Sequence, residues 1–170
     1  MTARPAPTVS ETRRRRVRHP IPARKSDGMT PKAAKPDVEL LSDIGLFKDL
    51  RPAALRRIRA AMQPAPFEAG EVIMAKDDAA SWARFYLVLD GTAQVVTAEG
   101  QTAHLGPGDT FGETSVLDGL PRSATVTATS KLETASLSSE SLRELLLEEP
   151  TITYQLLVEA CRRLRAAERP

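Results

Sequence analysis

The spacing of apolar residues changes along the chain, and the first stretch has a helical period. Between residues 38 and 66 apolar side chains recur three or four positions apart, as at Leu55, Ile58 and Met62. This spacing places them on one face of a helix. Pro52 fits a first helical turn, where its missing N–H costs nothing. We therefore expect two short helices here, separated by a break just before Pro52.

The next stretch, residues 67–137, favours strands. Residues 124–128 alternate strictly between apolar and polar side chains, and residues 85–89 form an apolar run typical of a buried strand. Glycine and proline separate these runs, as in Gly106-Pro107-Gly108. Many short strands with such turns predict an antiparallel sandwich or jelly roll. One short helix is expected inside it, over residues 114–117.

A helical period returns over residues 138–170. Ser138 is a suitable helix cap, and Pro150 divides the region into two helices. The second helix is expected to run to about Ala167. We expect Cys161 to be a buried thiol, because it lies on an apolar face of this helix. That face includes Leu157, Cys161 and Leu164.

These patterns predict a mainly β fold with flanking helices and a basic N-terminal extension. Residues 1–37 hold ten Lys or Arg against three Asp or Glu, whereas residues 38–170 hold fourteen against nineteen. The extension has few large apolar residues, so we expect a disordered basic tail. Its run Arg13–Arg16 is interpreted as a solvated extension, with an arm for nucleic acid or an anionic membrane as the alternative. The predicted domain is 38–170, divided into N-terminal helices (38–66), a β-roll (67–137) and C-terminal helices (138–170).

Composition excludes several classes of protein. No apolar run approaches the ~20 residues that cross a bilayer, and the N-terminus lacks a secretory signal, so a cytoplasmic protein without a transmembrane segment is expected. Cys161 is the single cysteine and the histidines are His19 and His104. An internal disulfide is therefore excluded, and a metal site or bound cofactor is not expected. No phosphate-binding loop with a lysine and no oriented nucleophile is present, so we do not expect an enzyme.

The segment from Gly108 to Val126 carries the clearest chemistry. A glycine-preceded helical turn exposes backbone N–H groups that favour a phosphate, and Arg122 supplies a planar charged fork. Glu113 would repel a phosphate, but it could accept a hydrogen bond from a sugar hydroxyl. Together these groups indicate a nucleotide. The alternative is a surface glutamate at a helix start with Arg122 as its ion-pair partner.

The residues Phe111-Gly112-Glu113, together with Arg122-Ser123-Ala124-Thr125-Val126, resemble the phosphate-binding cassette of the cyclic-nucleotide-binding domain family. The resemblance extends over roughly residues 38–165, including residues 85–91 and 106–109. It implies an antiparallel β jelly-roll, or double-stranded β-helix, with C-terminal hinge helices.

The resemblance also implies roles for individual residues. Glu113 would contact the ribose 2′-hydroxyl, and Arg122 the cyclic phosphate. Backbone N–H groups around Gly112, Thr114 and Ser115 would bind the phosphate, and the Ser115 hydroxyl could add a contact. Ser123 after the arginine favours cAMP, with cGMP as the other ligand. For the base, Tyr154 and Arg162 are either capping residues or ordinary helix residues.

The expected function is therefore a cyclic-nucleotide sensor that acts through its C-terminal helices. Because Pro170 directly follows the last helix, we expect the effector to be a separate, unidentified partner protein. A homodimer through residues 151–167 is a further hypothesis. The alternatives are an interaction module that keeps the fold without ligand control, and a nucleic-acid-associated protein that uses residues 1–37.

Overall fold

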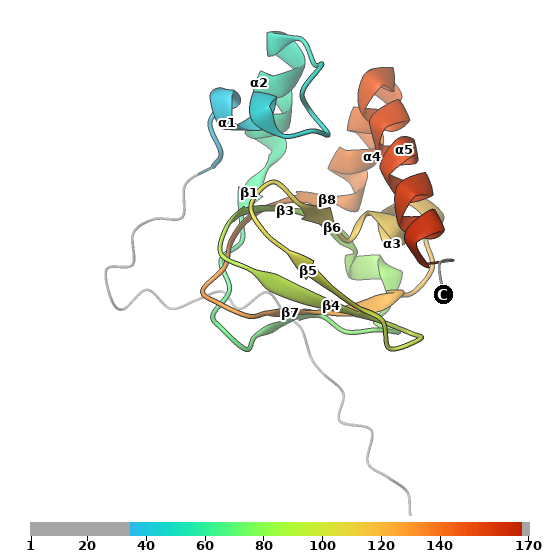
Figure 1. The fold of residues 1–170 in the computed structure, drawn as a ribbon. Helices are drawn as coiled ribbons and strands as arrows, with labels where there is room; N and C mark the ends of the chain where they lie inside the picture. The colour runs from blue at the N-terminus through green and yellow to red at the C-terminus, as the bar shows by residue number, and fades with distance from the viewer. Residues whose placement is uncertain (1–34, 168–170) are drawn as a thin grey trace, which may run out of the picture. The chain divides into compact units, whose positions relative to one another are not determined.

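The computed structural model describes residues 35–167, which form a β-roll with helices packed against it (Figure 1). In chain order the elements are α1 (Val38–Asp43), α2 (Pro52–Ala61), β1 (Gln63–Pro64), β2 (Val72–Met74), the 3-10 helix η1 (Ala80–Trp82), β3 (Arg84–Asp90), β4 (Ala93–Thr97), β5 (Thr102–Leu105), β6 (Thr110–Phe111), α3 (Glu113–Asp118), β7 (Ala124–Ala128), β8 (Glu133–Ser138), α4 (Ser139–Glu148) and α5 (Pro150–Ala167).

The strands form two antiparallel four-stranded sheets, as the jelly-roll prediction required. One sheet has the order β1-β8-β3-β6 and the other β2-β7-β4-β5. Strand β3 contributes to two cores, because its side chains alternate between the two faces of its sheet. Phe85 and Leu87 pack with the helices, whereas Tyr86 and Val88 pack with residues of the second sheet inside the roll. The fold class predicted from the sequence is confirmed.

The predicted caps and breaks are found where the sequence placed them. Ser138 Oγ accepts a hydrogen bond from the backbone N–H of Ser141 at 3.1 Å, which caps α4. Pro52 occupies the first turn of α2, and Pro150 begins α5. The short helix in the cassette is α3, which covers the predicted residues 114–117. Local sequence signals therefore mark where α2, α4 and α5 begin.

Two expectations need correction. Residues 63–66 were expected to close a helical region, but Gln63 and Pro64 form β1 and pair with Ser136 and Ala135 of β8. A proline is tolerated in β1 because this strand lies at the edge of its sheet.

The second correction concerns Cys161, which is exposed rather than buried. Helix α5 turns Ile152 and Leu156 into the core and leaves Leu157 and Leu164 more than 60% exposed. The helix is apolar on two opposite faces, and only one of them meets the core. The expected apolar face, with Cys161 at its centre, is the outer one.

The basic tail expected over residues 1–37 lies outside the described residues, apart from residues 35–37. In these, the Lys35 ammonium donates to the carbonyl of Ala60 at 2.7 Å, and the Asp37 carboxylate caps α1 by accepting from the N–H of Leu40. Among the described helices, none combines the length and apolarity needed to span a membrane.

Candidate nucleotide site

The turn from β6 into α3 is built around Gly112, which has φ +84°. A Cβ atom at this position would lie 2.5 Å from the carbonyl oxygen of Arg84 and 3.2 Å from Nη1 of Arg122. The backbone therefore approaches both groups too closely for any side chain. Gly112 also offers no side chain to cap α3, so the first turn of this helix has no side-chain cap.

Arg122 fills the space that Gly112 leaves open. Its guanidinium donates to the carbonyl oxygen of Gly112 at 2.9 Å and to that of Arg84 at 3.3 Å. The residue is 6% exposed. Two backbone hydrogen bonds of 2.9 Å hold the loop of Arg122 against the turn that follows β2. The N–H of Arg122 donates to the carbonyl of Asp78, and the N–H of Asp77 donates to the carbonyl of Arg122.

The charge of Arg122 is buried without a direct counter-charge. Within residues 35–167 no carboxylate comes within 4.0 Å of its guanidinium. Burial lowers the pKa of Arg122, and the charges of Tyr86, Asp78 and Glu113 act in the opposite direction. Desolvated charges are costly unless they are paired. Carbonyl dipoles alone hold this cation, so the arrangement is suited to an incoming anion.

Glu113 is the first residue of α3 and is 7% exposed. Its Oε1 accepts a hydrogen bond from Nη1 of Arg163 at 2.7 Å. Its Oε2 is buried and has no hydrogen-bond partner among the described residues. Because buried carboxylate oxygens are nearly always hydrogen-bonded, Oε2 is an acceptor available to a hydroxyl or amine of a ligand.

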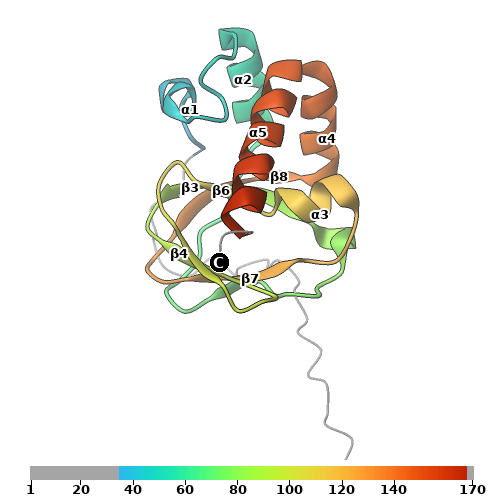
Figure 2. The same cartoon turned by 45° about the vertical axis from the view of Figure 1, so that its right-hand side comes forward.

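Arg163 fastens the end of α5 to this site. Besides Glu113, it donates through Nη2 to the carbonyl oxygen of Thr110 at 2.8 Å and through Nε to Oε1 of Glu159 at 3.1 Å. Figure 2 shows the C-terminal end of α5 beside α3 and β6. One guanidinium therefore joins a strand, the cassette helix and α5.

Arg163 lies within the predicted last helix but is not among the predicted site residues. The signal that could have found it is the spacing of Ile152, Leu156, Glu159 and Arg163, which puts them on one helical face. The first two are buried in the core. Polar residues that continue a buried stripe are expected to meet polar groups of the surface on which the helix packs.

The other predicted site residues are distributed as follows. The structure brings Gly112, Glu113 and Arg122 together, and it buries Ser115 in the first turn of α3. Thr114 and Ser123 are exposed. The alternative interpretation, an ion pair between Glu113 and Arg122, is not what the structure contains, because Glu113 pairs with Arg163.

Aromatic rings line the interior of the roll near Arg122. Tyr86 stacks on Phe111 with 4.9 Å between ring centroids and an interplanar angle of 11°, and it meets Phe67 edge-on. Burial raises the pKa of Tyr86, against the opposing effect of the Arg84 and Arg122 charges. The site therefore combines charged groups at α3 with an apolar, aromatic interior.

Comparison with known proteins is consistent with this geometry. A family model described as "Cyclic nucleotide-binding domain" matches residues 64–149, half of the chain. The chain is 29% identical over 132 residues to the "CRP-like cAMP-activated global transcriptional regulator" of Mycobacterium tuberculosis, matching 75% of this chain and 58% of that protein. It is 36% identical over 109 residues to the "cAMP-dependent protein kinase regulatory subunit" of Eremothecium gossypii, matching 64% of this chain and 23% of that protein.

Among solved structures, the chain is similar to the catabolite activator protein of Thermus thermophilus. The TM-score is 0.64 at 31% identity, over 73% of this chain and 60% of the other. The chain thus spans well under two thirds of the length of these relatives.

The close approach around Gly112 predicts the effect of a methyl group there. Gly112→Ala and Gly70→Ala both force alanine into a positive φ, +84° and +83°, but a Cβ at Gly70 meets no atom within 4 Å. We expect Gly70→Ala to lower the free energy of unfolding by about 1–2 kcal/mol, the cost of the left-handed conformation. Gly112→Ala should lower it by at least about 2 kcal/mol more, because Arg122 and the carbonyl of Arg84 must move.

Urea denaturation of both variants measures this difference. Equal losses for the two would show that the contact at Gly112 is not as tight as described.

Proposed function

The chain belongs to the cyclic nucleotide-binding domain family, and we propose that it is a sensor that binds a cyclic nucleotide, cAMP in preference to cGMP, beside α3. The proposal is supported by two buried polar groups beside α3 that each lack one kind of partner among the described residues. Arg122 is a buried cation without a carboxylate within 4.0 Å, and Glu113 Oε2 is a buried acceptor without a donor, both among the described residues. A cyclic phosphate joined to a ribose hydroxyl meets both requirements in one ligand.

The phosphate of the nucleotide accepts hydrogen bonds from the fork of Arg122, which is the stronger, charge-assisted kind. Its negative charge neutralises a guanidinium that burial has already stripped of water. The ribose 2′-hydroxyl donates to Glu113 Oε2. The preference for cAMP rests on Ser123, which follows the arginine, and on the two relatives whose names contain cAMP.

Arg163 supplies the step from binding to response. It uses Oε1 of Glu113, so Oε2 can accept from the ribose at the same time. The ribose and Arg163 would then bind the two oxygens of the same Glu113 carboxylate. Each contact orients this carboxylate for the other, so nucleotide binding and the attachment of α5 stabilise each other. The nucleotide favours the state in which α5 is attached to the roll, by as much as its affinity for the two states differs. Binding is the activity proposed here, and catalysis is not part of it.

The exposed outer face of α5 is the surface on which a partner binds. Leu157, Cys161 and Leu164 follow the four- and three-residue spacing of a coiled-coil seam. Leu157 and Leu164 are 61% and 62% exposed. We propose a second copy of the chain as the first partner on this face, with any further effector acting on the resulting pair of helices.

The pairing of Arg122 with phosphate predicts a large loss of affinity on its removal. Arg122→Ala should weaken cAMP binding at least about 100-fold, because a buried charge-assisted interaction is lost. Arg122→Lys keeps the charge but loses the fork, so it should be intermediate. Isothermal titration calorimetry with cAMP and cGMP measures these affinities, and urea denaturation checks that each variant is folded.

Failure of the wild-type protein to bind either nucleotide would contradict the proposal. It would favour an interaction module that has kept the fold without ligand control.

The role of Arg163 predicts that its removal separates binding from the movement of α5. Arg163→Met keeps the aliphatic stem and removes the contacts to Glu113, Thr110 and Glu159. We expect about tenfold weaker cAMP binding, equivalent to about 1.4 kcal/mol. In hydrogen exchange, cAMP should protect the amides of α5 in the wild type and no longer do so in the variant.

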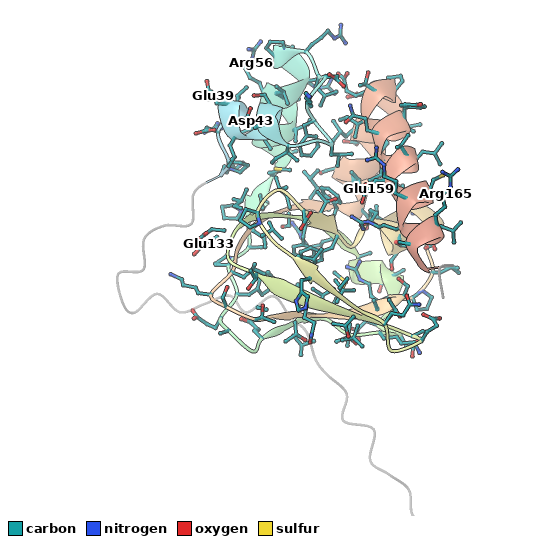
Figure 3. All side chains as sticks on the ribbon, viewed as in Figure 1. Glu39, Asp43, Arg56, Glu133, Glu159 and Arg165 are labelled. Atoms are coloured by element: carbon teal, nitrogen blue, oxygen red, sulfur yellow. The ribbon has the colours of Figure 1, made fainter. Side chains whose placement is uncertain are left out.

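Arg165→Met is the matched control, because Arg165 is exposed on the same helix (Figure 3) and has no salt bridge with a described residue. Undiminished protection of α5 in Arg163→Met would contradict the proposed link.

The seam on α5 predicts a dimer in which the alignment of the two α5 helices can be tested by cross-linking. In a parallel pair of α5 helices the two Cys161 side chains face each other, so mild oxidation should give a covalent dimer. Cys161→Ser should not cross-link, since the chain has one cysteine. Leu157→Asp should dissociate the dimer in sedimentation experiments. A wild-type monomer, both with and without cAMP, would exclude this partner.

A further inference from the structure

A second cleft, of about 440 Å³, lies beside the proposed nucleotide site, and it has a different set of groups. It opens between α5, the α1–α2 connection at Gly45 and the β5–β6 turn at Gly108. It shares Arg163 and Thr110 with the first site, but neither Arg122 nor any residue of α3 lines it. What binds in it is therefore a separate question from what binds beside α3.

Three polar side chains of α5 are arranged along this cleft. Gln155, Glu159 and Arg162 all line it, at the spacing of a single helical face. Glu159 is labelled on α5 in Figure 3. Gln155 and Arg162 lie seven residues apart, so at ~1.5 Å of rise per residue their backbones are separated by roughly 10 Å. A ligand that contacts both ends is elongated.

At the end of the cleft near Gln155, one buried acceptor has no hydrogen-bond donor within the described part of the chain. The side-chain amide of Gln155 donates to Oδ2 of Asp49 at 3.0 Å, which fixes its orientation. Its Oε1 is buried and has no hydrogen-bond partner among the described residues. A buried acceptor of this kind calls for an N–H or O–H group from a ligand. Tyr154, next to it, is 68% exposed and offers a ring for stacking.

At the other end of the cleft, the cationic side chain of Arg162 is largely exposed. Arg162 makes one ion pair within residues 35–167, to Glu159 at 3.7 Å, and its side chain is 73% exposed. Most of its N–H donors are therefore available to an anion. Glu159 lies between the two ends, and a lone pair of its Oε2 is free to accept from a hydroxyl, since the contact to Arg162 is long.

We propose that this cleft binds a nucleoside monophosphate with an open phosphate. The base stacks on Tyr154 and donates an N–H to Gln155 Oε1, a sugar hydroxyl donates to Glu159, and the phosphate dianion pairs with Arg162. Along α5 the cleft offers a ring with a hydrogen-bond acceptor, then a carboxylate, then a cation. A nucleoside monophosphate has the complementary groups in the same order: base, sugar hydroxyl and phosphate. This site does not depend on the cyclic-nucleotide site, because it uses neither Arg122 nor Glu113.

The test uses 5′-AMP as the probe and the full chain carrying Arg122→Ala, so that binding beside α3 is removed. We expect calorimetry to detect 5′-AMP with a Kd on the order of 0.1–1 mM. Adding Arg162→Ala should weaken this binding at least about tenfold. Arg165→Ala, which removes the same charge from a position outside the cleft, should leave it unchanged.

A second variant fills the cleft instead of changing its charge. A Cβ at Gly45 meets no atom within 4 Å, and the φ of Gly45 is not in the left-handed region, so we expect the chain to accept the side chain of Gly45→Val at the edge of the cleft. It should abolish 5′-AMP binding while leaving the thermal unfolding temperature unchanged. No binding up to 10 mM, or binding that survives both Arg162→Ala and Gly45→Val, overturns the proposal. Either result leaves the cAMP measurement on the wild type untouched.

Discussion

The site is organised around one unbalanced charge, the buried guanidinium of Arg122. Carbonyl oxygens of Gly112 and Arg84 receive its hydrogen bonds, and no carboxylate of the described residues lies within 4.0 Å of it. This arrangement sets other features of the chain. The turn into α3 must be glycine, because the guanidinium and a carbonyl take the space of a side chain. The loop before β7 must be held to the segment after β2, which the backbone bonds at Asp77 and Asp78 achieve. The Arg122 side chain then links this loop, which precedes β7 of one sheet, to β3 and to the turn after β6 of the other sheet.

Strand β3 connects the interior of the roll with the helices outside it. Alternate side chains of this strand belong to different cores, with Tyr86 facing the interior and Phe85 facing the helices. The two cores therefore share the backbone of one strand. The contact of Arg163 with Glu113 adds a direct polar route. The helices therefore contact the site region in two ways, through the apolar core beside β3 and through one ion pair.

Much of this architecture could be predicted from local sequence signals. Ser138 and Pro150 mark their helix boundaries because capping and proline geometry act over a few residues, and strand alternation gives the roll. The exposure of Cys161 could not be predicted, since α5 has two apolar faces and periodicity does not tell which one meets the core. The role of Arg163 depends on a partner fifty residues earlier in the chain, at a distance that only the folded structure defines. Long-range polar pairs are what pattern analysis misses.

The attachment of α5 through Arg163 also restricts how the chain can change in length. Each residue of an α-helix turns it by about 100°, so one inserted residue between Leu156 and Arg163 would swing the guanidinium away from Glu113. An insertion of seven residues would restore the direction but move the arginine about 10 Å along the axis. The contact between Arg163 and Glu113 therefore constrains the number of residues from Pro150 to Arg163. In homologues with the same contact, insertions and deletions should therefore be absent from the segment that corresponds to residues 150–163.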